Sequence, residues 1–251
     1  MGREQEMKAL ILAAGIGSRL RPLTYNVPKC LIQVKEKPIL ENALEHLNKN
    51  NIETVVIVVG YLGGKVQEYF GDQFRSTRLI YVENKAFNVT DNIYSVWLAK
   101  KHLNDDVLLL DADVLFEGKV IERVCKHNYS NIIVVDEYKS FMTGTGVNVD
   151  HEIVTEMILA KGVCPNIQPH PMLKTINIYR FSKEFMEKYF IPTLDECIEE
   201  GYHDEFYEFV IRKIIESNVV QLMALSIGGL KWCEIDTSKD LQVAERLFGK
   251  R

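Results

Sequence analysis

The stretch LAAGIGSRLRPLTYNVPKCLIQV, residues 12–34, begins inside a short apolar run, KALILA, at residues 8–13. A short apolar run ending in a glycine-containing loop is typical of a buried strand followed by a ligand-binding turn. The glycines and cations of the loop are Gly15, Gly17, Arg19, Arg21 and Lys29. Backbone N–H groups of glycine-rich turns can approach phosphate oxygens because no Cβ intervenes. The stretch therefore predicts a phosphate-bearing ligand at the end of the first strand.

The next part of the chain alternates between two hydrophobic periods. Continuous apolar runs predict buried strands at residues 54–60, 78–82, 106–110 and 131–135. Helical spacing falls between them at residues 38–48, 65–70 and 90–102. Strands that alternate with helices indicate βαβ units and a mostly parallel sheet, so the fold class is α/β.

The rhythm changes after residue 136. A hairpin is expected over residues 142–160, a strand at 173–181, helices over 182–218, strands at 222–227 and 231–235, and a last helix capped at residues 236–237. No repeat or linker divides the chain, so we expect a single domain over residues 1–251. Its phosphate-binding part would cover about residues 7–135, and a small substrate-side (acceptor-side) lobe about residues 136–251.

Composition excludes several classes of protein. The net charge is −5, which leaves no overall basic field to hold nucleic acid or anionic lipid, so we expect neither nucleic-acid nor membrane partners. No apolar run approaches the ~20 residues that span a bilayer. The five cysteines are scattered and contain no C-x-x-C, so we expect reduced thiols and a cytoplasmic protein. The oligomeric state stays open, with a homodimer as one option.

Two familiar phosphate loops do not fit residues 12–34. A dinucleotide fingerprint needs a third glycine where Leu20 stands. A Walker A loop would have to lie around Lys65, where the spacing is one residue short and valine replaces Ser or Thr. A third pattern fits: LAAGIGSRLRPLT followed by VPKCLIQV resembles the signature of sugar-phosphate nucleotidyltransferases and their cytidylyltransferase relatives.

The resemblance implies a three-layer Rossmann-like nucleotidyltransferase domain with a mostly parallel mixed sheet. Arg19 would grip a triphosphate bidentately, and Lys29 would stabilise the charge that develops at the α-phosphate. The loop residues that would contact the nucleotide are Leu12, Ala13, Ala14, Gly15, Gly17 and Ser18. A surface loop with solvated cations is the alternative, but it does not explain the ordered match.

Acidic residues follow two later strands. Asp111 and Asp113 end the apolar run LLLDAD, at the edge where open α/β sheets bind ligands. Two such carboxylates suggest Mg²⁺. By resemblance, Asp113 and Asp236 would be the metal ligands, and Asp111 would lie on the ribose side of the nucleotide or support the metal ligands. A purely structural Asp113 and a purely helix-capping Asp236 remain the alternatives.

The segment YVENKAFNVTDNIYSVWLA resembles bacterial choline-phosphate and 2-aminoethylphosphonate cytidylyltransferases. In that picture Glu83 and Asn84 lie where the base is read, and Asn92 and Ser95 lie near the ribose and phosphates. Satisfying the helix N-terminus is the alternative role for Asn92 and Ser95. Asp91 replaces the asparagine common in those relatives, and either caps the helix or adds charge near a ligand.

The acceptor side is less defined. The segments LKTINIYRF and DEFYE resemble cytidylyltransferases acting on small aminated phosphates or phosphonates, which implies that Lys174 helps to bind the phosphate or phosphonate group. An ammonium group attracts carboxylates and aromatic faces. We therefore expect Asp136, Glu205 and Tyr179 in the acceptor site, with core packing as the alternative for Tyr179.

These inferences lead to one main hypothesis and two alternatives. The first is a Mg²⁺-dependent cytidylyltransferase that joins CTP to a small zwitterionic phosphate or phosphonate, such as phosphocholine, 2-aminoethylphosphonate or phosphoglutamine, and releases pyrophosphate. The second is a sugar-1-phosphate nucleotidyltransferase using UTP or dTTP. The third is a nucleotide-binding regulatory subunit without catalysis, which would be expected to have lost Arg19, Lys29 or an aspartate.

Overall fold

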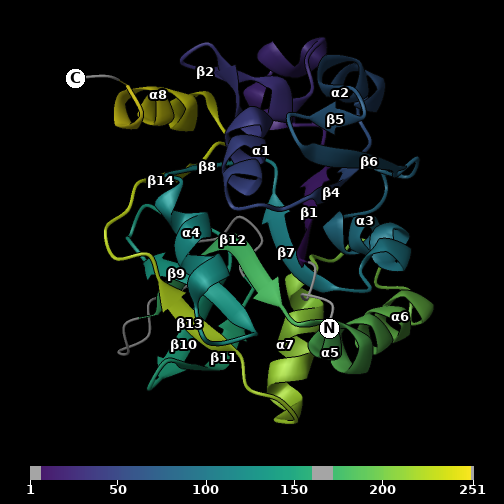
Figure 1. Ribbon diagram of the computed structural model, residues 1–251, viewed down its shortest axis with the longest axis vertical. Coiled ribbons are helices and arrows are strands. Elements are labelled where there is room, and N and C mark those ends of the chain that lie inside the picture. The colour runs from purple at the N-terminus through teal and green to yellow at the C-terminus, as the bar shows by residue number, and fades with distance from the viewer. Residues whose placement is uncertain (1–6, 160–171, 250–251) are drawn as a thin grey trace.

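A ten-stranded mixed sheet forms the centre of the molecule (Figure 1). The structure is a computed structural model and describes residues 7–159 and 172–249. The strand order is β10-β11-β13-β9-β12-β7-β1-β4-β6-β5, and the neighbours β7, β1, β4 and β6 run parallel. The strands are β1 (Met7–Ala13), β2 (Gln33–Val34), β3 (Lys37–Pro38), β4 (Thr54–Val59), β5 (Gln73–Phe74), β6 (Thr77–Glu83), β7 (Asp106–Asp111), β8 (Val114–Phe116), β9 (Ile132–Glu137), β10 (Gly146–Asp150), β11 (Ile153–Ile158), β12 (Leu173–Phe181), β13 (Met223–Ser226) and β14 (Trp232–Glu234).

Helices cover both faces of this sheet. They are α1 (Ile39–Lys49), α2 (Gly63–Phe70), α3 (Asn92–Ala99), α4 (Lys119–Lys126), α5 (Lys183–Phe185), α6 (Ile191–Glu199), α7 (Glu208–Ser217) and α8 (Ser238–Leu247). Helices α1, α2 and α4 pack on one face, and α3, α5, α6 and α7 pack on the other. The prediction of an α/β protein with three layers and a mixed, partly parallel sheet is confirmed.

The two hydrophobic cores follow from the alternation of side chains along each strand. In β1, Ile11 packs with the core under α1, α2 and α4, whereas Leu10 packs with the core under α3, α6 and α7. Both side chains are completely buried, which stabilises the fold by about 1.5–3 kcal/mol for each. Burial on both faces explains why the central strands appear in the sequence as continuous apolar runs.

The structure adds elements that the sequence patterns did not indicate. Strand β8 pairs with β14, and α4 follows β8 directly. The helix expected over residues 90–102 begins at Asn92 with Asp91 as its cap, and its last turn, Lys100–His102, is a 3₁₀ helix. Strand β12 runs antiparallel to both of its neighbours, β7 and β9, which makes the sheet mixed.

A third, smaller core fixes the opening loop to the end of the chain. It contains Leu20 and Ile32 from the loop, Leu115 from β8, and Ile235 and Ala244 from the C-terminal segment. All five side chains are buried. This core holds the loop that carries Arg19 and Lys29 beside the segment that carries Asp236, although the sequence separates them widely.

Candidate functional site

A cavity of about 520 Å³ opens at the carboxyl ends of β1 and β7. The opening loop forms one of its walls. The opposite wall comes from the first half of β12, the loop before β10, and the start of α7. Predicted site residues that line the cavity are Leu12, Ala13, Ala14, Gly15, Gly17, Ser18, Arg19, Lys29, Asn84, Asn92, Ser95, Asp111, Asp113, Lys174 and Asp236.

The loop after β1 is shaped by one glycine. Gly17 has a φ of 64°, a left-handed conformation that side chains with a Cβ rarely adopt. A Cβ at this position would also lie 3.0 Å from the Cβ of Lys29 and 3.1 Å from a methyl of Thr24. Thr24 closes the loop by donating its hydroxyl to the Gly17 carbonyl at 2.8 Å. Gly17 therefore brings Lys29 close against the glycine turn.

Lys29 joins the two aspartates expected to hold a metal. Its Nζ lies 2.5 Å from Asp113 Oδ2 and 2.7 Å from Asp236 Oδ1. Arg19 also reaches Asp236 Oδ1, at 2.8 Å. The helix cap beside Asp236 is Thr237, whose hydroxyl accepts from the Asp240 N–H. The Asp236 carboxylate is thus directed to the cations of the loop and does not cap α8.

Charge at this end of the cavity is balanced. Burial by itself would lower the pKa of Lys29, but Asp113 and Asp236 outweigh burial, and the pKa is raised. Burial would raise the pKa of Asp236, but Lys29 and Arg19 lower it. Lys29 and Asp236 therefore stay charged at neutral pH, and the loop end places two basic side chains against two carboxyl groups.

The carboxylate pair fits a magnesium ion. Asp113 Oδ1 is buried and has no hydrogen-bond partner in the protein, so it is available to a ligand. Within the described ranges no cluster of three or more His, Cys, Asp or Glu forms a metal site. Mg²⁺ commonly takes only one or two carboxylates and completes its coordination with substrate phosphates and water. Asp113 and Asp236 would therefore be its protein ligands.

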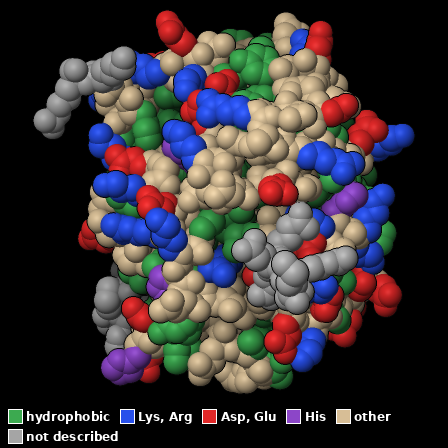
Figure 2. All heavy atoms as spheres, viewed as in Figure 1, with side chains coloured by type: hydrophobic (Ala, Val, Ile, Leu, Met, Phe, Trp, Pro, Cys, Tyr) green, Lys and Arg blue, Asp and Glu red, His purple; other side chains and the backbone are tan. Residues whose placement is uncertain are grey.

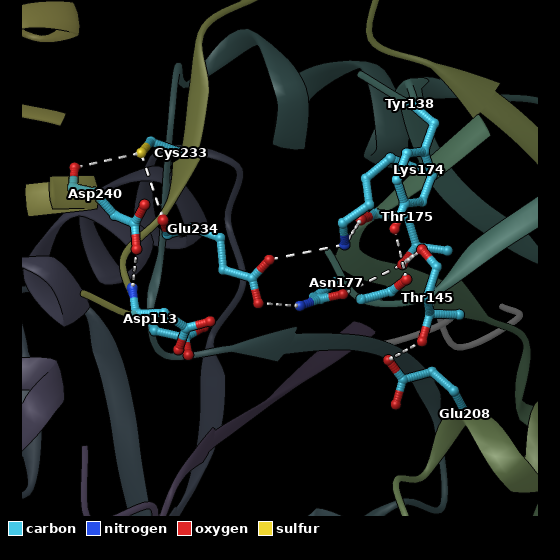
Figure 3. Close-up of polar contacts among 12 residues, drawn as sticks. Asp113, Tyr138, Thr145, Lys174, Thr175, Asn177, Glu208, Cys233, Glu234 and Asp240 are labelled. Carbon is cyan, nitrogen blue, oxygen red and sulfur yellow. Dashed lines mark hydrogen bonds and ion pairs between the residues drawn. The ribbon is translucent and has the colours of Figure 1, made fainter. Parts of the chain in front are cut away.

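The far end of the cavity lies where β12 extends past the end of β7 (Figure 3). Lys174 is 2% exposed, donates to the Thr175 carbonyl at 2.8 Å, and lies 3.7 Å from Glu234 Oε2. Asn177 occupies a bulge in β12 with a left-handed φ of 56°, which asparagine tolerates. Its amide donates to Glu234 Oε1 at 3.3 Å. Glu234 thus holds Lys174 and Asn177 together at this end.

Glu208 is the second carboxylate of the far end. It is the first residue of α7 and is 4% exposed. Its Oε1 accepts from the hydroxyl of Thr145 at 3.4 Å, whereas its Oε2 is buried without a hydrogen-bond partner in the protein. Burial raises the pKa of Glu208 to about 7. Burial also raises the pKa of Asp111 and of Glu234.

The NIYS segment shapes the cavity through hydrogen bonds. Asn84 is buried and donates to Ser95 Oγ at 3.1 Å and to Thr90 Oγ1 at 3.2 Å. Asn92 Oδ1 accepts from the Tyr207 N–H at 2.8 Å, which joins the start of α3 to the start of α7. Asp91 accepts from the Asn92 N–H at 2.7 Å as a helix cap. These residues line the cavity and also hold its walls together.

Four of the predicted site residues do not line the cavity. Glu83 is exposed and lies 3.8 Å from Lys85. Asp136 accepts from the indole N–H of Trp232 at 2.7 Å. Tyr179 is completely buried in a hydrophobic core, with its ring edge-on to that of Tyr207. At Glu205 the backbone carbonyl accepts from the Ile93 N–H, while Phe206 and Glu208 line the cavity instead.

The sequence motifs also missed several lining residues. They are Cys30, Thr143, Gly144, Thr145, Asn177, Phe206, Glu208 and Glu234. Two of them carried a usable signal: Glu234 stands two residues before Asp236, and Glu208 lies at the start of an amphipathic helix. The others lie in loops and at a β-bulge, and only the folded chain brings them together.

Chemically, the cavity can hold a polyanion at one end and a cation at the other. The loop end offers a glycine turn, Arg19 and Lys29 to phosphate oxygens. Within the described residues no nucleophile–base pair is apparent in the lining. None is required if the attacking group is already an anion, because cations and positioning then supply the catalysis. Figure 2 shows acidic and basic side chains interspersed over one face of the molecule, so the polyanion site is local.

Comparison with known proteins identifies the family of the chain. The family model for nucleotidyl transferases matches residues 8–147. CMP-5'-(3-aminopropyl)phosphonate synthase of Streptomyces rubellomurinus is 30% identical over 96% of this chain and 39% of its own length. Choline-phosphate cytidylyltransferase of Streptococcus pneumoniae is 35% identical over 50% of this chain and 53% of its own. CTP:phosphoglutamine cytidylyltransferase of Campylobacter jejuni is 27% identical over 94% of this chain and 98% of its own length.

Solved structures share the fold. CTP:phosphocholine cytidylyltransferase from Streptococcus pneumoniae superposes with a TM-score of 0.78 at 23% identity and covers 96% of this chain and 98% of its own. The inositol-1-phosphate CTP transferase from T. maritima superposes with a TM-score of 0.74 at 23% identity, and the match covers 97% of this chain and 96% of its own. The chain spans less than two thirds of the length of the first two relatives above. No described helix is both long and apolar enough to cross a bilayer.

Proposed function

This chain belongs to the nucleotidyl transferase family, and we propose that it transfers CMP from CTP to a small amine-bearing phosphate or phosphonate, releasing pyrophosphate. The observation that carries the proposal is the group formed at the loop end of the cavity by Arg19, Lys29, Asp113 and Asp236. Relatives that act on aminopropylphosphonate, choline phosphate and phosphoglutamine favour CTP and an aminated acceptor.

The chain's residues have separate tasks in this reaction. The glycine turn and Arg19 bind the triphosphate, and Lys29 stabilises the negative charge that gathers at the α-phosphate. Mg²⁺, held by Asp113 and Asp236, would supply further charge neutralisation on the triphosphate. The acceptor needs no general base because its phosphate or phosphonate oxygen is already anionic. The cavity's main task is to place two anions next to each other.

Pyrophosphate release with Mg²⁺ tests the proposal. CTP, UTP, dTTP, ATP and GTP are each combined with phosphocholine, phosphoethanolamine, 2-aminoethylphosphonate, phosphoglutamine and glucose-1-phosphate. We expect pyrophosphate release only in the mixtures that contain CTP, and the acceptor that gives the fastest release identifies the substrate. Release from UTP or dTTP with glucose-1-phosphate would replace the proposal by a sugar-phosphate nucleotidyltransferase. Nucleotide binding without release in any mixture would support a regulatory subunit.

A further inference from the structure

The far end of the cavity has more carboxyl groups than basic groups. Three buried or half-buried carboxylates line it, Asp111, Glu208 and Glu234, together with one lysine, Lys174. Lys174 lies 3.7 Å from Glu234. Among the residues that the structure describes, no ion pair joins Asp111 or Glu208 to a lysine or arginine. A cation from outside the protein would therefore be stabilised at this end.

Glu208 has the geometry of an incomplete hydrogen-bonding site. Thr145 occupies Oε1, and the remaining oxygen, Oε2, is buried and unpartnered in the protein. Leaving a buried carboxylate oxygen without a donor costs free energy, so such oxygens usually mark a bound ligand or water. Figure 3 shows Glu208 with Thr145 on the side of the cavity away from Asp113. An acceptor whose phosphate lies near Lys29 would extend its other end toward Glu208.

Resting on the proposed function, we propose that Glu208 binds the ammonium group of the acceptor, and that this group is a primary ammonium and not a trimethylammonium. A primary ammonium brings three N–H donors, which complete the hydrogen bonding of Oε2 and neutralise the carboxylate. A trimethylammonium brings charge but no donor, and would leave Oε2 unsatisfied.

The aromatic residues of the described lining agree with this choice. Trimethylammonium groups are bound by several aromatic faces together. The lining has two phenylalanines, Phe87 and Phe206. Phe87 lies at the loop end of the cavity. A Cβ placed on Gly60 would be 2.8 Å from the Phe87 Cβ and would also contact Ala14 of the glycine turn. The ring of Phe87 is edge-on to that of Tyr61. Of the described lining, Phe206 is then the aromatic residue next to Glu208. Tyr179 and Tyr207 also lie near this carboxylate, but they are completely buried and do not line the cavity, so no cage is formed.

The test uses acceptors that differ only at the amine. With the full chain, CTP and Mg²⁺, kcat/KM is measured for phosphoethanolamine against phosphocholine, and for 2-aminoethylphosphonate against propylphosphonate, in which methyl replaces ammonium. We expect the primary amine to be preferred by about 10- to 100-fold in each pair, the range of one charged hydrogen bond. Glu208→Gln should bring the ratio of kcat/KM for 2-aminoethylphosphonate to that for propylphosphonate close to one, mainly by raising the KM for 2-aminoethylphosphonate.

Three further variants make the result interpretable. Glu216→Gln removes an exposed carboxylate from the same helix and should leave both preferences intact. If Glu208→Gln also loses propylphosphonate turnover, Glu208→Asp and Thr145→Val decide. The first should retain most of the amine preference, and the second should weaken it without affecting CTP.

The outcomes separate the two proposals. Equal use of phosphocholine and phosphoethanolamine by the wild type, or an unchanged amine preference in Glu208→Gln, would overturn the inference and leave the cytidylyltransferase proposal intact. Absence of pyrophosphate release by the wild type with CTP and every acceptor would overturn the proposed function itself, and the inference with it.

Discussion

The two ends of the cavity solve opposite electrostatic problems. At the loop end, Lys29 and Arg19 form ion pairs with the carboxylates of Asp113 and Asp236. At the far end, burial raises the pKa of Glu208 to about 7, and Oε2 of this carboxylate has no partner in the protein. The loop end is therefore suited to bind phosphate oxygens. Under the proposed function, the far end would discriminate between acceptors.

The largest expected effects come from the loop end. Lys29→Ala and Asp113→Asn should each lower kcat by at least about 10²- to 10³-fold, the usual loss when one group that stabilises transition-state charge is removed. The fold should survive, because the carboxylates of Asp113 and Asp236 are each 21% exposed and can be hydrated when Lys29 is absent. Pyrophosphate release and thermal melting measure the two properties.

The matched control is Lys65→Ala, which removes a lysine that donates to the Asn26 carbonyl on the outside of the same loop. It should keep near-normal turnover. Near-normal turnover in both Lys29→Ala and Asp113→Asn would show that the loop end is not the reacting end, and the comparison between the two ends would lose its basis.

A lysine at the far end should instead affect stability. Lys174→Met leaves the Glu234 carboxylate without its cation, and we expect the free energy of unfolding to fall by about 2 kcal/mol. Glu234→Gln in the same chain should restore much of the loss, which urea denaturation of the single and double variants would measure. Lys188→Met, on an exposed helical pair with Glu184, should change nothing measurable. If Lys174→Met lowered the free energy of unfolding no more than Lys188→Met does, the Lys174–Glu234 pair would not be effectively buried.

The same contrast explains which parts of the site could be predicted. The loop end is built from contiguous motifs: the glycine turn and Lys29 lie within one stretch, and Asp113 directly follows a buried strand. Here the residue types alone determine the chemistry. The alternation of hydrophobic periods likewise predicted the parallel half of the sheet, because strands buried on both faces appear as apolar runs.

The far end could not be predicted in this way. Its residues come from the loop before β10, a bulge in β12, the start of α7 and the end of β14. Asp136 and Glu205 were reasonable carboxylates for an ammonium. Asp136, however, accepts a hydrogen bond from Trp232, and Glu205 lies three residues before Glu208, outside α7. Which side of the α7 start faces the cavity depends on its hydrogen bond to Asn92, a tertiary contact without a local sequence signal.

The raised pKa of Glu208 predicts a pH dependence of acceptor choice. Because Glu208 must be ionised to bind an ammonium, preference for 2-aminoethylphosphonate over propylphosphonate should rise by about 10-fold between pH 6 and 8, as the ionised fraction grows around pKa 7. The ammonium of 2-aminoethylphosphonate also favours the dianion of its own phosphonate, so the profile of the wild type is compared with that of Glu208→Gln, in which this difference between the acceptors is the same. The titratable groups around Glu208 are Lys174, Glu234, Asp111, Tyr179 and Tyr207. A pH profile that persists in Glu208→Gln would assign the titration to one of these.

The smallest expected effect distinguishes the roles of two neighbouring residues, Asp236 and Thr237. Thr237 and Asp240 form a capping box at α8, in which Asp240 Oδ2 accepts from the Thr237 N–H at 2.7 Å. Thr237→Ala should therefore lower the free energy of unfolding by about 1 kcal/mol and leave kcat within about 2-fold. Thr237→Ser should retain the cap. Asp236→Asn should do the reverse, with little loss of stability and a large loss of activity, because its carboxylate contacts Lys29 and Arg19. If Thr237→Ala lowered kcat as strongly as Asp236→Asn, the cap would be what positions Asp236, and the loop end would depend on α8 as much as on its own cations.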